Sequence, residues 1–295
     1  MSSLVVFSPA KLNLFLAVTG RRPDGYHDLV SVAAPVEFGD TLRIEAAGGG
    51  EFVLECDDAA VPTGEENLVL RAAGLFAEKT GWTGGAKFFL EKRIPMGAGL
   101  GGGSSNAVAA LRGLNSLAGE PLGAAGLAAV AARLGSDCAL FLPGGPVVMR
   151  GRGERVEPLA AETAARLRGP RVLIFKPGFS ISTPWAYAQL AADGKKNYRP
   201  ATEAETQLAA WLGDAKAPAE SLLFNSFERP AFWKFPALPV LLDGLGREFG
   251  LSARLSGSGS ACFALLPAGT ATEPVQSRIR EAWGAAAWMV ETRIA

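Results

Sequence analysis

Histidine and cysteine are scarce in this sequence, which has one histidine, His27, and three cysteines in 295 residues. Cys56, Cys138 and Cys262 are far apart, form no CxxC pair and make no metal-ligand cluster with His27. This spacing argues against a cysteine-histidine metal centre and a disulfide framework. It predicts reduced, partly buried thiols in a cytoplasmic protein, with no metal held by cysteine or histidine.

The sequence also lacks net charge and long apolar runs. Its 29 lysine and arginine residues balance 29 aspartate and glutamate residues, so we expect no basic face for nucleic acid. No stretch reaches the roughly 18 apolar residues of a membrane span. The first residues carry no basic segment ahead of their short apolar run, which argues against a signal peptide. We therefore expect a soluble protein with no nucleic-acid or membrane partner. The sequence specifies no oligomeric state.

Hydrophobic residues make up 48% of the chain, enough for a full core at this length. Apolar and β-branched runs predict strands over residues 4–7, 12–18, 41–46, 51–55, 86–92, 172–176, 253–255, 261–266 and 288–292. Helical spacing predicts helices over residues 67–79, 105–117, 122–134, 184–190, 203–212, 232–249 and 275–283.

Several segments between these elements have a less regular pattern. We expect a linker or surface helix over residues 160–170 and an exposed polar loop over 193–202. Strands followed by helices indicate an α+β fold. We predict two lobes, an N-terminal domain over residues 1–155 and a C-terminal domain over 156–295.

A glycine-rich loop is the most informative stretch. Five of the seven residues 97–103 are glycine, which lets backbone N–H groups approach a ligand closely. The loop consists of Pro95, Met96, Gly97, Ala98, Gly99, Leu100, Gly101, Gly102 and Gly103, and Ser104 and Ser105 follow it. We predict that the two serines cap the next helix, whose N-terminus favours an anion. The pattern is that of a phosphate cradle, and a flexible connector is the plainer alternative.

Three common phosphate sites do not fit this loop. Gly97, Gly99 and Gly102 satisfy the dinucleotide spacing GxGxxG, but the acidic residue about 20 positions on, Glu120, falls between two predicted helices instead of at the end of a strand. No lysine follows the glycines as a P-loop requires. The strand, loop and DFG motifs of protein kinases are also missing.

Two charged residues stand in apolar surroundings elsewhere. Lys11 interrupts a strand that otherwise reads as buried, and Asp137 is the one charge in an apolar run after a helix. An aspartate paired with a lysine could orient and deprotonate an alcohol that attacks a γ-phosphate. Singly, Asp137 could cap a turn and Lys11 could extend its charge to solvent.

Three segments together resemble the motifs of the GHMP kinases. They are residues 8–18 with 24–27, residues 92–106, and residues 254–263. The first motif is more specific than the superfamily as a whole. Pro9–Leu14 followed by Arg22–His27 resembles the branch of that superfamily acting on 4-diphosphocytidyl-2-C-methyl-D-erythritol in non-mevalonate isoprenoid biosynthesis. The match extends over nearly the whole chain, in order.

The resemblance implies ATP-dependent phosphorylation of the 2-hydroxyl of that substrate, with Mg²⁺. It implies two α+β lobes and an active site in the cleft between them. Lys11 and Asp137 would be the catalytic pair, with Asp137 as base or orienting group. Residues 95–105 would wrap the ATP phosphates, and Asn67 would lie near the adenine.

On the substrate side, the resemblance assigns Asn13, Tyr26 and His27, with Tyr26 stacked on the cytosine. Tyr187 is the candidate for the other face of that ring, and Trp185 is the alternative. Gly257 and Ser258 would approach from the second lobe. The sequence departs from the family's pattern after Asp137, where Cys138-Ala139 replaces Val-Pro.

Other functions remain open on the sequence alone. A kinase of homoserine or of a mevalonate derivative would share the superfamily motifs, although residues 24–27 argue against it. A nucleotide-binding protein without turnover is a second alternative, and the retention of Lys11 and Asp137 argues against that. A dehydrogenase is the third.

Overall fold

The computed structural model describes residues 3–295, and only the backbone of Lys195 among them. Strands and helices are mixed along the chain, which confirms the predicted α+β class. The residues form two compact units, and each draws on separate parts of the sequence. The first unit comprises residues 3–10, 38–96 and 101–144, and the second comprises 11–37, 97–100 and 145–295.

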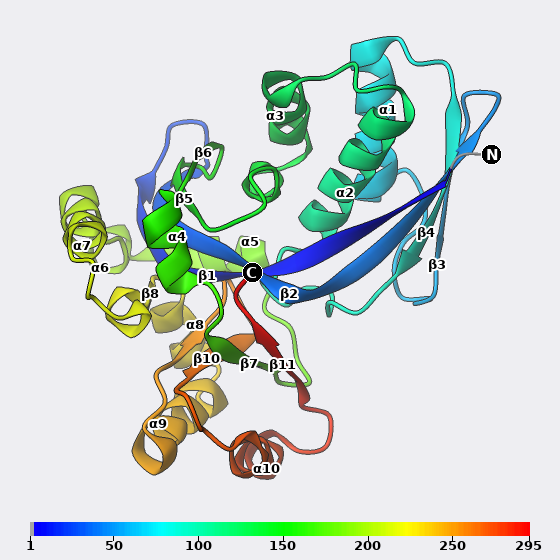
Figure 1. Ribbon diagram of the computed structural model, residues 1–295. Coiled ribbons are helices and arrows are strands. Elements are labelled where there is room, and N and C mark those ends of the chain that lie inside the picture. The colour runs from blue at the N-terminus through cyan, green and yellow to red at the C-terminus, as the bar shows by residue number, and fades with distance from the viewer. Residues whose placement is uncertain (1–2) are drawn as a thin grey trace. The chain divides into compact units, whose positions relative to one another are not determined.

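The first unit places helices against strands. Its part of the sheet contains β3 (Phe52–Cys56), β4 (Gly85–Glu91) and the ends of β1 (Ser3–Arg21) and β2 (His27–Ala47). β2 runs antiparallel to β4, and β4 runs parallel to β3. The helical elements are α1 (Leu68–Thr80), α2 (Gly102–Leu117), α3 (Ala124–Leu134) and the 3₁₀ turn η1 (Ala139–Phe141). In Figure 1, α1, α2 and α3 gather on one side of these strands.

The second unit holds the other ends of the two long strands and a separate sheet. β8 (Phe224–Asn225) pairs parallel with β1, β5 (Val147–Gly151) pairs with β2, and β6 (Arg155–Pro158) pairs with β5. The second sheet has the order β11-β7-β10-β9 and is antiparallel. Its strands are β7 (Arg171–Lys176), β9 (Ala253–Leu255), β10 (Cys262–Leu266) and β11 (Trp288–Arg293).

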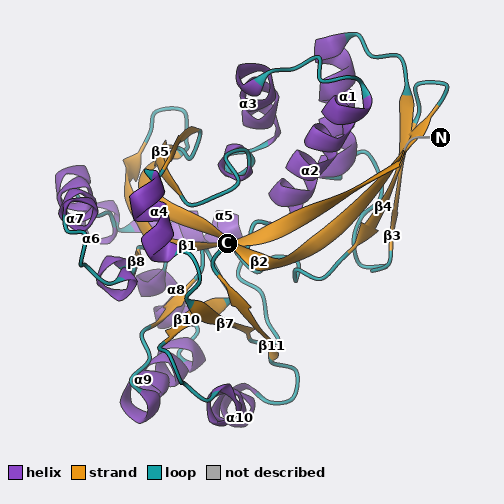
Figure 2. Ribbon diagram, viewed as in Figure 1, coloured by secondary structure: helices purple, strands orange, loops and turns teal. Residues whose placement is uncertain are grey.

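The second unit also contains most of the helices. They are α4 (Ala161–Leu167), α5 (Thr183–Ala192), α6 (Gly194–Asn197), α7 (Ala201–Gly213), α8 (Glu228–Lys234), α9 (Ala237–Phe249) and α10 (Thr272–Trp283), with the 3₁₀ turn η2 (Ala219–Leu222). Figure 2 shows α9 and α10 side by side, next to the strands that they cover. Phe175 and Phe263 are fully buried on neighbouring strands of the sheet.

Capping residues set several of the predicted boundaries. Asn67 is the N-cap of α1 and accepts a hydrogen bond from the Val69 amide, and the helix ends at Gly81 in the left-handed region. Ser182 caps α5 in the same way, with Pro184 inside the first turn. Such side chains satisfy N–H groups that a helix start leaves unpaired.

Two differences from the predicted elements involve a proline. Residues 232–249 form two helices instead of one, because Pro236 disfavours helical backbone at Phe235, where φ is −122° and ψ is 74°. The predicted strands 4–7 and 12–18 are one strand, β1, which continues through Pro9. Since β8 joins β1 at Phe15 and Leu16, the missing N–H of Pro9 lies outside that pairing.

Other segments are more ordered than expected. The predicted loop 193–202 contains α6 and the start of α7. The segment 160–170 contains α4, which agrees with the surface helix that was one of the two expectations there. β2 begins at His27, well before the predicted residue 41, and β5 and β6 were not predicted. Among residues 3–295, no helix combines the length and apolar character needed to cross a membrane.

Candidate active site

The glycine-rich loop leads into α2 without a side-chain cap. Gly101 is the N-cap, with a left-handed φ of 73°, and α2 begins at Gly102. Ser104 and Ser105 therefore lie inside the first helical turn, and the prediction that they cap the helix is wrong. Glycine can take the left-handed cap conformation without steric cost, so the helix starts three residues early. The first-turn N–H groups lie within a glycine-rich segment, as anion binding requires.

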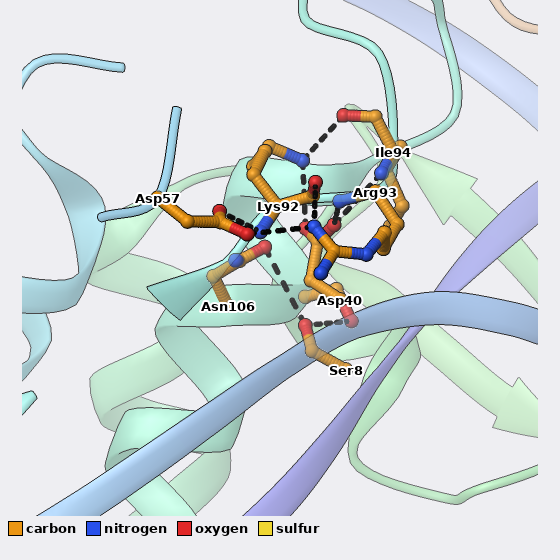
Figure 3. A network of polar contacts seen from close by, with 8 residues as sticks. Ser8, Asp40, Asp57, Lys92, Arg93, Ile94 and Asn106 are labelled. Atoms are coloured by element: carbon orange, nitrogen blue, oxygen red, sulfur yellow. Dashed lines mark hydrogen bonds and ion pairs between the residues drawn. The ribbon is translucent and has the colours of Figure 1, made fainter. Parts of the chain in front are cut away.

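Ser8 of β1 holds this first turn. Its Oγ donates to Ser105 Oγ at 2.9 Å and lies 3.4 Å from Asn106 Oδ1 (Figure 3). All three side chains are buried. Asn106 Nδ2 has no hydrogen-bond partner, alone among buried side-chain nitrogens and oxygens of the described residues. The start of α2 is thus fixed to a strand and retains one unused donor.

Asp137 lies in the turn between α3 and η1. The Cys138 amide donates to Gly135 O at 3.2 Å, and the Phe141 amide donates to Cys138 O at 3.2 Å. Asp137 is half-buried, whereas Cys138 is fully buried. Burial raises the pKa of the Cys138 thiol to about 11, and a hydrogen bond with Ser104 opposes the rise. The thiol thus ties the Asp137 turn to the first turn of α2.

Asn67 uses its side chain locally. Oδ1 accepts from the Val69 amide at 2.9 Å, and Nδ2 donates to Pro62 O at 2.6 Å. The residue is a helix cap in the first unit, and a role beside the adenine stays a prediction.

The centre of the glycine-rich loop, residues 97–100, belongs to the second unit. Leu100 O accepts from the Lys11 amide at 3.0 Å, and Ala98 O accepts from the Ala261 amide at 3.0 Å. Gly99 O accepts from Ser256 Oγ at 3.2 Å. Three successive carbonyl groups are therefore hydrogen-bonded: that of Leu100 to the first motif, that of Ala98 to the third, and that of Gly99 to both.

Lys11 is buried beside this loop, with only 2% of its surface exposed. Its Nζ donates to Gly99 O at 2.7 Å and to Asn13 Oδ1 at 2.5 Å. Asn13 Nδ2 in turn donates to Ser31 Oγ at 3.0 Å, and Ser31 Oγ donates to Phe15 O at 2.6 Å. This chain of hydrogen bonds fixes the ammonium group, as positioning for phosphoryl transfer requires.

Gly257 packs directly on this lysine. Its φ is 55°, and a Cβ there would lie 2.9 Å from Gly99 O and 3.2 Å from Lys11 Nζ. Asn225 holds the segment by donating to Leu255 O and Gly257 O at 2.7 and 2.8 Å. The third motif therefore requires glycine at this position.

His27 lies among aromatic rings in the second unit. Its ring centroid is 4.8 Å from that of Tyr187, and its Nε2 is 3.0 Å from the Tyr198 hydroxyl. Burial lowers the pKa of His27, and the positive charge of Arg21 lowers it further. Both effects favour the neutral imidazole, which can donate a hydrogen bond at one nitrogen and accept one at the other.

Tyr26 directly precedes His27 in the sequence, and 51% of its surface is exposed. Its amide donates to Asp24 Oδ1 at 3.1 Å, and its carbonyl accepts from the Arg22 amide at 2.7 Å. The Arg152 guanidinium carbon lies 4.9 Å from the ring centroid. The Tyr26 backbone is thus held by two hydrogen bonds, and Arg152 contacts the ring. Half of the residue is still exposed to solvent.

The structure separates the two candidates for the second aromatic partner. Tyr187 contacts His27 and Phe227, whereas Trp185 contacts Phe235 and Lys234. Tyr187 therefore lies with the histidine of the first motif. On the same helix, Thr183 Oγ1 is 2.7 Å from Ser258 Oγ, which links α5 to the third motif.

Sequence reasoning missed several of these residues. Ser31, Asn225, Tyr198 and Arg152 support the predicted site residues through single contacts. Tyr198 fell in the expected loop, and the other three carry no local pattern. Lys11 and Asp137 lie in different units, so their pairing stays a prediction. In the part of the chain that the structure describes, no three histidine, cysteine, aspartate or glutamate residues could hold a metal ion together.

Comparison with known proteins defines the class. The N-terminal domain of the GHMP kinases matches residues 67–147, and the C-terminal domain matches residues 204–287. The chain belongs to the GHMP kinase family.

Curated relatives narrow the similarity within that family. A 4-diphosphocytidyl-2-C-methyl-D-erythritol kinase of Synechococcus sp. strain CC9902 is 40% identical, and the match covers 89% of this chain and 87% of the relative. A kinase of the same name from Synechococcus elongatus is 36% identical, with 96% and 92% covered.

Solved structures agree. A crystal structure of 4-(cytidine 5'-diphospho)-2C-methyl-D-erythritol kinase superposes with a TM-score of 0.76 at 38% identity, covering 99% of this chain and all of that one. A homoserine kinase from Cytophaga hutchinsonii superposes with a TM-score of 0.73 at 19% identity, covering 100% of this chain and 95% of that one. The latter similarity concerns the fold alone.

Proposed function

We propose that this chain is an ATP-dependent kinase that phosphorylates the 2-hydroxyl of 4-diphosphocytidyl-2-C-methyl-D-erythritol. The observation that carries the proposal is the similarity over nearly the full length to curated kinases of that name, at 32–40% identity. The residues of all three family motifs are present, and within each unit they contact one another.

Different residues of the chain have different roles in the proposed reaction. We assign the ATP phosphates to the glycine-rich loop and the first turn of α2, and Asn67 to the region of the adenine. The 2-hydroxyl oxygen attacks the γ-phosphorus as its proton passes to Asp137, and the bond to the β-phosphate oxygen breaks to release ADP. Lys11, fixed by Gly99 and Asn13, stabilises the negative charge that develops on the phosphoryl oxygens.

The substrate end of the site uses the second unit. Tyr26 offers an exposed ring for the cytosine, Tyr187 a second ring, and His27 a neutral imidazole. We assign Asn13, Gly257 and Ser258 to the reacting end of the substrate, and the contacts of Asn13 and Gly257 with Lys11 support this assignment. We place the active site in a cleft between an N-terminal domain, residues 1–155, and a C-terminal domain, residues 156–295.

Mg²⁺ belongs to this proposal as the companion of ATP. Magnesium is usually held by one or two carboxylates, substrate phosphates and water, and the described residues offer no carboxylate cluster. Oxygens of the ATP phosphates would then supply most of its ligands. Asp137 is the acidic residue that we assign to the same end of the site. The free cysteines fit a cytoplasmic location.

A coupled assay of ADP release tests the proposed function. The enzyme is offered 4-diphosphocytidyl-2-C-methyl-D-erythritol, homoserine and mevalonate separately, each with ATP and Mg²⁺. We expect turnover on the cytidylyl alcohol alone, and phosphorus NMR should place the new phosphate on its 2-hydroxyl. A preference for either of the other two alcohols would overturn the proposal.

A further inference from the structure

A buried carboxylate lies behind the glycine-rich loop in the first unit. Asp40, near the middle of β2, is fully buried, and its Oδ2 accepts from Lys92 Nζ at 2.7 Å. Its Oδ1 accepts from the backbone amides of Arg93 and Ile94 at 2.7 and 2.8 Å (Figure 3). A carboxylate can be kept in a protein interior when it is paired and hydrogen-bonded in this way.

Lys92 closes the arrangement. Its Nζ also donates to Ile94 O at 2.5 Å, so one side chain reaches both the carboxylate and the backbone two residues on. Asp40 and Lys92 together hold both amides and one carbonyl of residues 93–94, directly before Pro95. We call Asp40 and Lys92 the loop clamp.

The loop clamp also contacts the other end of the glycine-rich loop. A Cβ added at Gly102, the first residue of α2, would lie 3.1 Å from Lys92 Nζ and 3.1 Å from the Ile94 side chain. The backbone before the loop and the helix after it thus pack on the same ion pair. Ser8, on the neighbouring strand β1, holds the same helical turn through Ser105.

Charge gives the clamp a second effect. An unpaired ammonium beside a helix N-terminus is repelled by the positive end of the helix dipole. Asp40 neutralises Lys92, so the ammonium group can stay against Gly102 without that penalty. The first-turn N–H groups then keep the spacing that an anion needs.

We propose that Asp40 is a positioning residue for ATP, acting through Lys92 to fix both ends of the glycine-rich loop. The inference rests on the proposed function for the identity of the nucleotide. Asp40 touches neither substrate; it sets the backbone that does. Misplacing such backbone by about 1 Å can cost as much as a hundredfold in activity.

The test compares Asp40→Asn with Asp57→Asn. Asp57 contacts the same two residues, accepting from the Lys92 amide and the Arg93 guanidinium at 2.7 Å each, but it is exposed. We expect Asp40→Asn to raise the KM for ATP by about tenfold or more and to leave the KM for the cytidylyl substrate within about twofold. Asp57→Asn should change neither constant beyond about twofold.

A binding measurement accompanies the kinetics. Calorimetry with a non-hydrolysable ATP analogue should show the same loss of affinity in Asp40→Asn, and it does not depend on which alcohol is phosphorylated. If the wild type binds the analogue but does not turn over the cytidylyl substrate, the proposed function is wrong. The calorimetric comparison of the wild type with Asp40→Asn then still tests the role of the loop clamp. The Asp40→Asn change should have less effect in a Lys92→Met background, since the two residues act together.

Three results would overturn the inference. They are a folded Asp40→Asn with wild-type ATP affinity, an equal rise in both KM values, and an equal effect from Asp57→Asn. If Asp40→Asn does not fold, the binding measurements on Lys92→Met test the inference instead. This variant leaves Asp40 bonded to the amides of residues 93 and 94, and it must weaken binding of the ATP analogue several-fold without changing affinity for the cytidylyl substrate.

Discussion

Lys11 and Gly99 are joined directly, because Nζ of Lys11 donates a 2.7 Å hydrogen bond to the carbonyl oxygen of Gly99. Ser256 donates to the same oxygen at 3.2 Å. One carbonyl group therefore links the first, second and third motifs within the second unit. The lysine proposed to stabilise the transferred phosphoryl group is held by the loop proposed to bind the phosphates.

Replacing Asp137 by asparagine should separate binding from chemistry. The amide keeps the size of the side chain but cannot take a proton from the alcohol, so we expect kcat to fall by about 10²- to 10⁴-fold. The affinity for an ATP analogue, measured by calorimetry, should stay within about threefold. Wild-type turnover in the variant would remove Asp137 from the mechanism. It would also favour a role for this turn in structure alone.

Replacing Gly257 by alanine should damage the site and the fold together. A Cβ would approach Gly99 O to 2.9 Å at a φ of 55°, so we expect kcat to fall and the free energy of unfolding to drop by about 1–2 kcal/mol. Gly74→Ala is the matched control. Gly74 lies in α1, a Cβ there meets nothing within 4 Å, and alanine should stabilise the helix by up to about 1 kcal/mol. Urea unfolding and steady-state kinetics of both variants check this, and equal behaviour would contradict it.

Removing the hydroxyl of Tyr198 should weaken the substrate end alone. In Tyr198→Phe, His27 loses its 3.0 Å partner, so we expect the KM for the cytidylyl substrate to rise up to about tenfold, as for one neutral hydrogen bond. The KM for ATP should not change. Steady-state kinetics with each substrate varied in turn measure both constants. A parallel rise in both would indicate a general loss of structure.

The stability of the protein should depend on the protonation of His27. Its pKa is lowered in the folded state by burial and by Arg21, so the unfolded chain takes up the proton first as the pH falls. The stabilisation is present above the unfolded pKa of about 6.5 and is lost as the pH falls through the lower folded value. We expect the stability advantage of wild type over His27→Gln, measured by urea unfolding, to shrink between about pH 7.5 and 5.5. A constant difference over that range would contradict this.

The thiols should differ in reactivity. Burial raises the pKa of all three thiols, that of Cys138 to about 11 and that of Cys262 well above its usual value. Cys138 and Cys262 are buried, whereas Cys56 is half-buried and open to a reagent. We expect a disulfide reagent at about pH 8 to spare Cys138 and Cys262 in the native protein and to label all three cysteines in urea. Cys138→Ser should lower the count in urea by one. Fast labelling of native Cys138 would contradict its burial.

Local chemistry made part of this fold predictable. Asn67 begins α1 as its sequence position indicates, and the run at residues 253–255 is a strand with the predicted bounds. The start of α2 was not predictable in the same way. Serine at a helix start suggests a cap, but Gly101 can take the left-handed cap conformation more easily and moves the boundary.

The residues of the candidate site were also predictable only in part. Lys11 and the glycine-rich loop were identified because a charge in an apolar strand and a run of glycines are unusual locally. Asp40 and Tyr198 were missed because their partners, Lys92 and His27, lie 52 and 171 residues away in the sequence. No window of sequence shows such a contact, since it exists only once the strands have paired.

The two long strands have a consequence for how such a gene can change. β1 and β2 each contribute one end to the first unit and the other end to the second. Neither unit is encoded by a continuous stretch, so recombination cannot exchange one of them as a module. A chain cut at residue 155 would yield two fragments that depend on each other to fold, because the second fragment lacks β1, with which β8 pairs, and β5, with which β6 pairs.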